Sequence, residues 1–268
     1  RSPFDRLRAS GTLCGDAMTV TLDVQRNGPV ARVFLNRPEV RNAFNDGVIA
    51  ELAQVFTELG RDDDLRVVVL GGHGKAFCAG HDLKEIRAAP SLDYYERLFA
   101  QCGRMMMTIQ KLPVPVIARV QGTATAAGCQ LVAMCDLAVA SSDARFAVSG
   151  VNLGLFCSTP SVALSRNLGR KAAFEMLVTG DFISAEEAKA KGLVNRVAAP
   201  DALDAEVERL VASIVAKPSV AIAAGKGLFY RQLEKPIEAA YADAGSTMAC
   251  NMMDEAALEG VQAFIDKR

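Results

Sequence analysis

Residues 120–136 read VQGTATAAGCQLVAMCD, and this stretch decides the fold. Just before it, residues 114–120 are β-branched and apolar, which predicts a buried strand. After Ala126 the residues are small and permit a helix, so we expect the chain to turn from strand into helix there. The first N–H groups of a helix have no internal partner and lie at its positive end. The turn therefore predicts a site for an anion or an oxyanion.

A second stretch, KAFCAGHDL at residues 75–83, has the same character. It is a turn of small residues that directly follows the expected strand Val67 to Leu70. An oxyanion hole needs N–H donors that are aimed at one oxygen, and two turns of this kind can converge on it. Taken alone, each turn is equally well read as a packing loop that contains glycine.

Length and composition place the chain among ordinary α/β proteins. A chain of 268 residues, half of them hydrophobic, predicts one main core with a C-terminal subdomain. We divide it into a disordered or non-native lead (1–17), a core (18–200) and a helical C-terminal region (201–268). A net charge of -1 gives no reason to expect nucleic acid or an anionic membrane as partner. The apolar runs are well short of the ~20 residues that a membrane span needs.

Cysteine and histidine usage argues against metal chemistry. The chain has 7 cysteines, no C-x-x-C pair and only 2 histidines, so we expect neither a zinc site nor a disulfide framework. Buried, inert thiols in a reducing compartment are the favoured interpretation, with a cytoplasmic location. A mitochondrial location is the alternative if residues 1–17 are the remnant of a transit segment. The run GGHGK at residues 71–75 fails as a nucleotide-binding P-loop, because its glycine spacing is wrong and no Ser or Thr follows the lysine.

Periodicity and capping signals outline the other elements. A hairpin is expected around Asn27-Gly28-Pro29, and Asn45 is expected to cap a helix that ends at Gly60. A long helix is expected over 91–111 with Leu92, Tyr95, Phe99, Cys102, Met106 and Ile109 facing inward. Ser158 or Thr159 is expected to cap one further helix, and Ser184 to Glu187 form a capping box for another. From Ala202 onward the pattern is helical, so strand-strand-helix units are followed by an all-α tail.

Three motifs carry a resemblance to a known family: NRPEVRNAF (36–44), KAFCAGHDLKE (75–85) and GTATAAGCQLVAMCDLAVAS (122–141). In this order they resemble the crotonase, or enoyl-CoA hydratase/isomerase, superfamily. The resemblance runs from about Met18 to the C-terminus. It implies a spiral of ββα units with a C-terminal helical trimerisation region, and an acyl- or enoyl-CoA thioester as the partner. It also implies a homotrimer or a dimer of trimers, and no cofactor, because the CoA moiety belongs to the substrate.

The resemblance also implies roles for individual residues. The backbone N–H groups of His81 and Ala127 match the oxyanion hole of the family. A set of clamp residues matches its CoA-binding site: Arg41, Ala43, Cys78, Ala79, Gly80, Asp82, Leu83 and Lys84. Arg87 and Lys226 are further candidates, with Lys84, to meet the CoA phosphates, although an exposed basic side chain is more often simply solvated.

The chain departs from the hydratases of this family at two positions. Gln130 and Gly150 match the two glutamates that hold and activate the added water, and neither can ionise. Efficient hydration is therefore not expected. Two classes stay open: an enzyme that uses the oxyanion hole for another reaction, and a catalytically inactive protein that binds acyl-CoA.

Two side-chain roles also stay open in the sequence. The His81 side chain is either a base or, more often for such a residue, a hydrogen-bonded loop residue. Cys157 is either an acyl-accepting nucleophile or a packed thiol, and the second is favoured. Asn152, Cys157, Ser158 and Thr159 are expected to line the acyl pocket. A positive φ at Gly150 would make a glutamate there strained.

Overall fold

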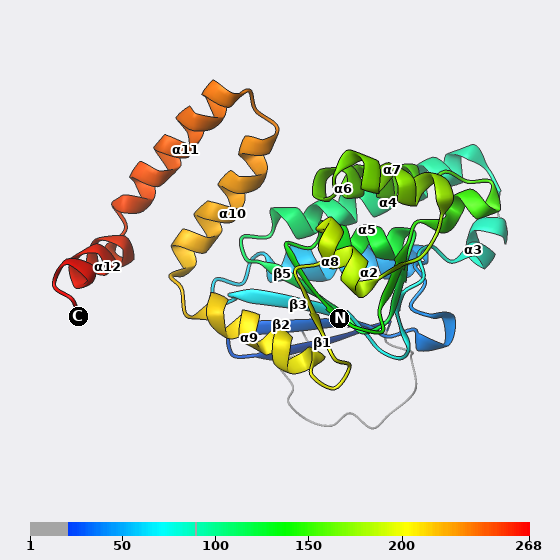
Figure 1. Ribbon diagram of the computed structural model, residues 1–268, viewed down its shortest axis with the longest axis horizontal. Coiled ribbons are helices and arrows are strands. Elements are labelled where there is room, and N and C mark those ends of the chain that lie inside the picture. The colour runs from blue at the N-terminus through cyan, green and yellow to red at the C-terminus, as the bar shows by residue number, and fades with distance from the viewer. Residues whose placement is uncertain (1–20, 89) are drawn as a thin grey trace.

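The chain builds two β-sheets with helices packed around them (Figure 1), and between residues 67 and 147 successive strands lie alternately in one sheet and in the other. The computed structural model describes residues 21–88 and 90–268, so the expectations for residues 1–17 lie outside it. The larger sheet contains β1 (Leu22–Asn27), β2 (Val30–Leu35), β3 (Val67–Gly72), β5 (Val116–Val120), β7 (Leu137–Ser141) and β10 (Arg196–Ala198). The smaller sheet contains β4 (Ala76–Cys78), β6 (Thr123–Thr125), β8 (Arg145–Ala147) and β9 (Ile183–Ser184).

The pairing of these strands gives a spiral. The hairpin β1–β2 is antiparallel, and β2, β3, β5, β7 and β10 follow one another as parallel neighbours. In the smaller sheet β4, β6 and β8 are parallel, and β9 closes it antiparallel to β8. The pairs β3–β4, β5–β6 and β7–β8 thus each pass from the larger to the smaller sheet before a helix begins. The expected α/β spiral of ββα units is confirmed.

Helices follow the strand pairs and then form the whole C-terminal part. Those of the first part are α2 (Asp46–Leu59), α3 (Leu83–Ala88), α4 (Leu92–Lys111), α5 (Ala127–Met134), α6 (Ser158–Asn167), α7 (Arg170–Thr179) and α8 (Ala185–Lys191), with short 3-10 helices η1 (Pro38–Val40) and η2 (Ser149–Leu153). The last four are α9 (Leu203–Val215), α10 (Ser219–Leu233), α11 (Ile237–Met252) and α12 (Glu255–Ile265).

Most helix starts agree with the capping signals in the sequence. Asn45 caps α2 by accepting from the Val48 N–H at 2.9 Å, and Ser184 forms the expected capping box with Glu187. The expectation for α6 was wrong by one residue. Its N-cap is Cys157, and Ser158 is already helical, with its hydroxyl on the Phe156 carbonyl at 3.3 Å.

One inward-facing assignment on α4 was also wrong. Leu92 is 71% exposed, because it lies in the first turn, beyond the part of the helix that packs on the core. The buried face of α4 consists of Leu98, Cys102, Met105, Met106 and Ile109. Tyr95 and Phe99 are half-buried at its edge.

The core lies between the sheets and the helices that cover them. Residues of α2, α4 and α5 join one large apolar cluster with both sheets, and all six residues of β3 are buried. On the other face of the larger sheet, Leu203, Val207, Leu210 and Val211 of α9 pack on Val67, Val69 and Ile117. Helix α5 is buried from Ala127 to Ala133, so the candidate site begins at the centre of the molecule.

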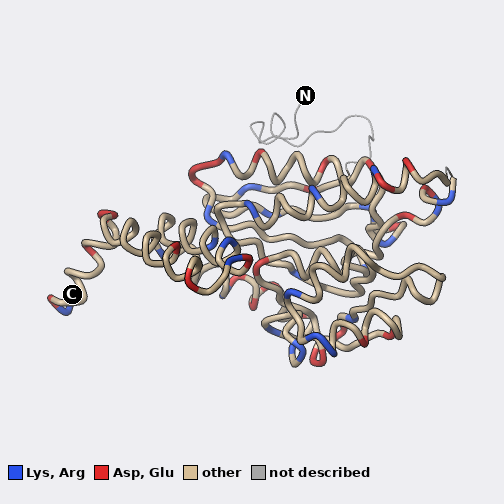
Figure 2. Tube along the Cα trace, turned by 90° about the horizontal axis from the view of Figure 1, so that it is seen from above, with Lys and Arg blue, Asp and Glu red and all other residues tan. Residues whose placement is uncertain are grey.

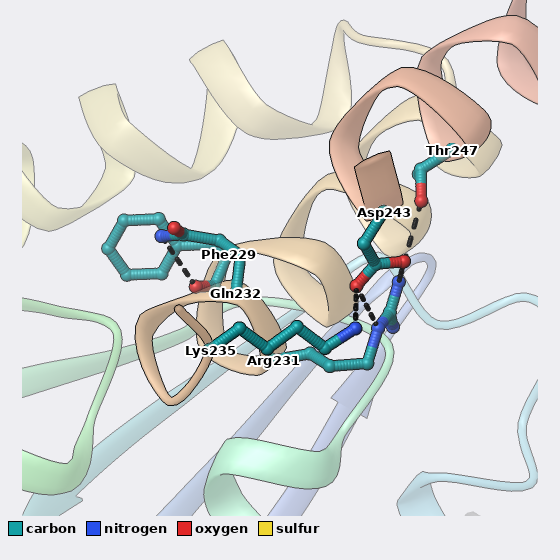
Figure 3. Close-up of polar contacts among 6 residues, drawn as sticks. All are labelled: Phe229, Arg231, Gln232, Lys235, Asp243 and Thr247. Carbon is teal, nitrogen blue, oxygen red and sulfur yellow. Dashed lines mark hydrogen bonds and ion pairs between the residues drawn. The ribbon is translucent and has the colours of Figure 1, made fainter. Parts of the chain in front are cut away.

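The C-terminal arm, residues 219–265, extends away from this body (Figures 1 and 2). Arg231 and Lys235 both pair with Asp243, which holds α10 against α11 (Figure 3). The arm exposes many large apolar side chains: Phe229, Leu233, Ile237, Tyr241, Met248, Met253 and Phe264 are all more than half exposed. Within residues 21–88 and 90–268, no helix has the length and apolar character needed to cross a membrane.

Candidate active site at the start of helix α5

Two glycines lock the turn before α3 against the start of α5. A Cβ atom on Gly80, which has φ +91°, would lie 2.9 Å from the Ala126 Cβ and 3.3 Å from the Ala127 nitrogen. A Cβ atom on Gly128 would lie 2.1 Å from the Cys78 carbonyl oxygen. No side chain fits at either place, so the glycines bring the backbones of the two turns into direct contact.

Ala126 between them has an unusual backbone conformation. Its φ of 49° and ψ of -118° are rare for a residue with a Cβ atom, although glycine adopts them readily. Its N–H donates to the Ala147 carbonyl at 2.9 Å, which fixes the turn to strand β8. Strain of this kind persists where the surrounding structure holds it, and it concentrates at functional sites. The strained residue directly precedes the first N–H group of α5.

The two N–H groups singled out in the sequence have no acceptor. Across residues 21–88 and 90–268, neither the His81 N–H nor the Ala127 N–H donates a hydrogen bond. Their neighbours do: the Asp82 N–H donates to the Phe44 carbonyl at 2.7 Å. A pair of free N–H groups on two interlocked turns is the arrangement that an oxyanion hole requires.

The His81 side chain is held in an apolar setting. Its ring lies edge-on to Phe44 and Phe99, with ring centroids 6.3 Å and 5.6 Å apart. Burial lowers the pKa of His81 from 6.5 to about 4, and the buried Nε2 atom has no partner among the described residues. The imidazole is therefore neutral at physiological pH and is a weak base.

The clamp residues expected from the sequence are brought together by a short backbone ladder. The Ala79 N–H donates to the Arg41 carbonyl at 3.0 Å, and the Phe44 N–H donates to the Gly80 carbonyl at 2.7 Å. Residues 41–44 thus run beside residues 78–83. The Asp82 carboxylate is already engaged, because it accepts from the Lys84 N–H and lies 3.6 Å from the Arg37 guanidinium.

Asn42 supports this ladder and was not singled out in the sequence. Its buried side-chain amide donates to the carbonyl oxygens of His73 and Ala76 at 2.9 Å and of Phe77 at 3.2 Å. Its own φ is 57°, a conformation that asparagine tolerates better than most residues. The sequence signal that could have identified Asn42 is its place in the motif NRPEVRNAF, where it is a polar residue between Arg41 and Ala43.

The structure separates the candidate phosphate partners. Arg41, Lys84 and Arg87 are exposed around the turn. Lys226 is not available, which corrects the sequence expectation. It is 9% exposed, and its ammonium donates to the Asp136 carboxylate at 2.6 Å and to two backbone carbonyls. Lys226 therefore anchors the arm.

The two positions that match the family glutamates, Gln130 and Gly150, have different surroundings. Gln130 is 4% exposed, and its Oε1 atom is buried without a partner among the described residues. At Gly150, a Cβ atom would lie 2.5 Å from the Leu155 carbonyl oxygen and 2.7 Å from the Cys157 Sγ. Gly150 does not have a positive φ, so the backbone strain that a positive φ would cause for a glutamate there does not arise. Crowding, and not backbone conformation, excludes a side chain.

The neutral residues that were expected to line the acyl pocket also differ in their exposure to solvent. Thr159 lines a cavity beside Gln130, whereas Asn152 and Ser158 are exposed. Cys157 is buried, and burial raises its pKa, so the thiolate is disfavoured. Burial also raises the pKa of Cys78, Cys102 and Cys129 to about 12, as expected for inert thiols.

Comparisons with known proteins agree with this architecture. A family model described as enoyl-CoA hydratase/isomerase matches residues 25–268. The chain belongs to the enoyl-CoA hydratase/isomerase family. It is similar to a solved enoyl-CoA hydratase of Mycobacterium smegmatis, with 65% identity, a TM-score of 0.92, and coverage of 92% of this chain and 97% of that one.

Within the family, the chain is similar to enoyl-CoA hydratase domain-containing protein 3. The crystal structure of the human protein of that name has 40% identity and a TM-score of 0.89, with 92% of this chain and 98% of that one covered. The Rattus norvegicus relative, named mitochondrial, is 43% identical over 100% of this chain and 92% of its own length. The motifs at 81–85, 126–130 and 154–160 indicate the same resemblance. The relatives' names give the cytoplasmic expectation no support and fit its mitochondrial alternative in part.

Proposed function

We propose that this protein binds an acyl- or enoyl-CoA thioester and holds the thioester oxygen between the N–H groups of His81 and Ala127. The observation that carries the proposal is the pair of unpaired N–H groups on two turns locked together at Gly80 and Gly128. The thioester oxygen gains negative charge when the α-carbon becomes carbanionic or when a nucleophile attacks the carbonyl. Each donor of such a hole contributes on the order of 3 kcal/mol of transition-state stabilisation.

The CoA moiety would lie along the backbone of residues 41–44 and 78–83. Arg41, Lys84 and Arg87 surround this ladder with exposed positive charge that suits phosphate groups. Asp82 contributes by capping α3 and pairing with Arg37, so it supports the clamp and does not contact the phosphates.

The same site is a poor hydratase in this proposal. Gln130 can orient a water or a substrate hydroxyl but cannot accept its proton, Gly150 offers no side chain, and His81 is a weak base. Because one general acid–base group contributes ~10²–10⁴-fold, crotonyl-CoA hydration should be at least about a hundredfold slower than in a competent hydratase. Hydration at the rate of an efficient enzyme would show that another acid–base pair operates.

Calorimetry with acetoacetyl-CoA tests the proposal. The thioester should bind more tightly than free CoA, since only the thioester presents an oxygen to the two donors. Ala127→Pro removes one donor at the first helical position and should cancel most of that preference. Glu255→Pro, at the first position of α12, is the matched control for a proline at a helix start.

Circular dichroism establishes that each proline variant is folded before its binding is measured. Two results contradict the proposal: equal affinity of the unmodified protein for acetoacetyl-CoA and CoA, or a folded Ala127→Pro variant that keeps the full preference.

The second candidate function is a non-catalytic acyl-CoA-binding protein. The crowding of Gly150 by Leu155 and Cys157 favours it, because these two residues leave no room at this position for a catalytic carboxylate. A turnover screen of the purified protein across acyl-CoA classes separates the two functions. Turnover of any class supports the enzyme, and binding without turnover supports the second candidate.

A further inference from the structure

A chain of hydrogen-bonded peptide units leads from the Arg37 side chain to the His81 N–H. The Arg37 guanidinium donates to the Ala43 carbonyl at 2.7 Å, and the N–H of that same peptide unit belongs to Phe44. The Phe44 N–H donates to the Gly80 carbonyl at 2.7 Å. The peptide unit of this second carbonyl carries the His81 N–H, which donates to no acceptor among the described residues. The free donor is therefore the last group of a chain that starts at a cation.

The geometry of the peptide unit aligns the dipoles of this chain. Both peptide units are trans, so the C=O and the N–H of each point in opposite directions. A donor that approaches the carbonyl strengthens the N–H at the other end, and hydrogen bonds in series polarise one another by roughly 10–30% per bond. Both bonds of the chain are at the short end of the range for N–H···O contacts. The positive charge of Arg37 thus makes the His81 N–H a stronger donor.

The surroundings of Arg37 screen its charge only in part. Its side chain is 18% exposed, and electrostatic interactions are stronger in such a setting than in bulk water. The Asp82 carboxylate offsets some of the charge from 3.6 Å, a distance that makes an ion pair but not a hydrogen bond. The short hydrogen bond of the guanidinium is the one to Ala43, at the start of the chain.

The Ala127 donor is polarised in a comparable way by helix α5. Its N–H shares a peptide unit with the Ala126 carbonyl, which accepts from the Gln130 N–H at 3.0 Å. The aligned peptide units of a helix give its first N–H groups a positive partial charge. His81 begins no helix and instead forms an isolated bridge with Phe44. The chain from Arg37 supplies at His81 the polarisation that the helix supplies at Ala127.

We propose that Arg37 is a positioning residue for the thioester oxygen, because it orients and polarises the His81 N–H through two peptide units. The inference rests on the proposed binding of that oxygen between His81 and Ala127. The charge at position 37 is the decisive property. Its loss should weaken one of the two donors and leave the other intact.

The test measures the carbonyl stretch of butyryl-CoA, labelled with ¹³C at the thioester carbon, by difference infrared spectroscopy on the full chain. Arg37→Gln keeps amide donors but removes the charge, and it should make the shift on binding smaller by roughly 10–30%. Arg37→Lys keeps the charge and should retain most of the shift. Asp82→Asn keeps an acceptor for the Lys84 N–H and removes the offsetting charge, so it should make the shift larger.

Arg26→Gln is the matched control, because Arg26 is also half-buried, donates to the Gly28 carbonyl and pairs with Asp62, beside the β1–β2 hairpin. It should leave the shift unchanged. Circular dichroism establishes that each variant is folded. A shift that Arg37→Gln leaves unchanged, or that Arg37→Lys reduces as much, would overturn the inference while thioester binding stands.

The Asp82→Asn variant keeps the inference testable if Arg37→Gln does not fold. An unchanged or smaller shift in Asp82→Asn would then overturn it. A bound thioester with no shift in the unmodified protein would instead overturn the proposed function.

Discussion

Lys226→Met removes a buried charge that ties the C-terminal arm to the core. The ammonium donates to the carbonyls of Ile109 at 3.0 Å and Val114 at 2.9 Å, and to the Asp136 carboxylate at 2.6 Å. Asp136 also accepts from the Val116 N–H at 2.6 Å and from the Tyr230 hydroxyl at 2.7 Å. Burial lowers the pKa of Lys226, and the Asp136 charge offsets this in part.

The magnitude follows from what the substitution leaves behind. Methionine has a similar length but no charge, so Asp136 keeps a carboxylate that is 12% exposed and has lost its cation. Breaking a buried pair by removing one partner costs about 3–5 kcal/mol. For a chain of this size the melting temperature should fall by roughly 6–20 °C.

Chemical denaturation and thermal melting measure this loss. Lys235→Met is the matched control, because Lys235 pairs with Asp243 on the same arm while its side chain is 34% exposed. The control should lose no more than about 1 kcal/mol, as for other solvent-screened pairs. A Lys226→Met protein that loses no more stability than Lys235→Met would refute the anchoring role.

Three further predictions concern the candidate site and the assembly. The pKa of His81 is about 4 in the folded protein and 6.5 when unperturbed, so its contribution to stability is present above pH 6.5 and is lost as the pH falls to about 4. His81→Phe should remove about 3 kcal/mol of that pH dependence, measured as the difference in unfolding free energy between pH 7.5 and pH 4; an unchanged difference would contradict the assignment. Ala126→Gly should raise stability by about 1 kcal/mol in urea denaturation, because the strain relieved exceeds the entropy cost of a glycine; a loss of stability would show that Ala126 is not strained. Light scattering should find a trimer or a dimer of trimers, since the arm exposes a long apolar surface, and a mass of 28.5 kDa would contradict this.

The sequence predicted the fold well where local signals and the family motifs agree. Asn45 and Ser184 cap their helices as expected, and the run at 120–136 does pass into a helix at Ala127. The short strand β6 inside that run was missed. Its three residues pair with β4 and β8, and such pairing depends on chain segments far apart in the sequence.

The candidate site was predicted in its backbone and less well in its side chains. The types and the spacing of the residues indicated the turns at His81 and Ala127, because small residues after a strand mark a place where two backbones approach closely. Lys226 was misassigned because an exposed and a buried lysine look alike in a sequence, and its partner Asp136 is distant along the chain. The crowding at Gly150 depends on its neighbours in space, which the presence of a glycine in the sequence does not reveal.

The vibrational frequency of the bound thioester carbonyl tests the central claim most directly. An acyl-CoA labelled with ¹³C at the thioester carbon would be studied by difference infrared spectroscopy, free and bound to the protein. If the N–H groups of His81 and Ala127 both donate to its oxygen, the carbonyl stretch should move to lower frequency on binding, and Ala127→Pro should reverse most of that shift. A bound thioester whose carbonyl frequency equals that in water, or is higher, would contradict the claim.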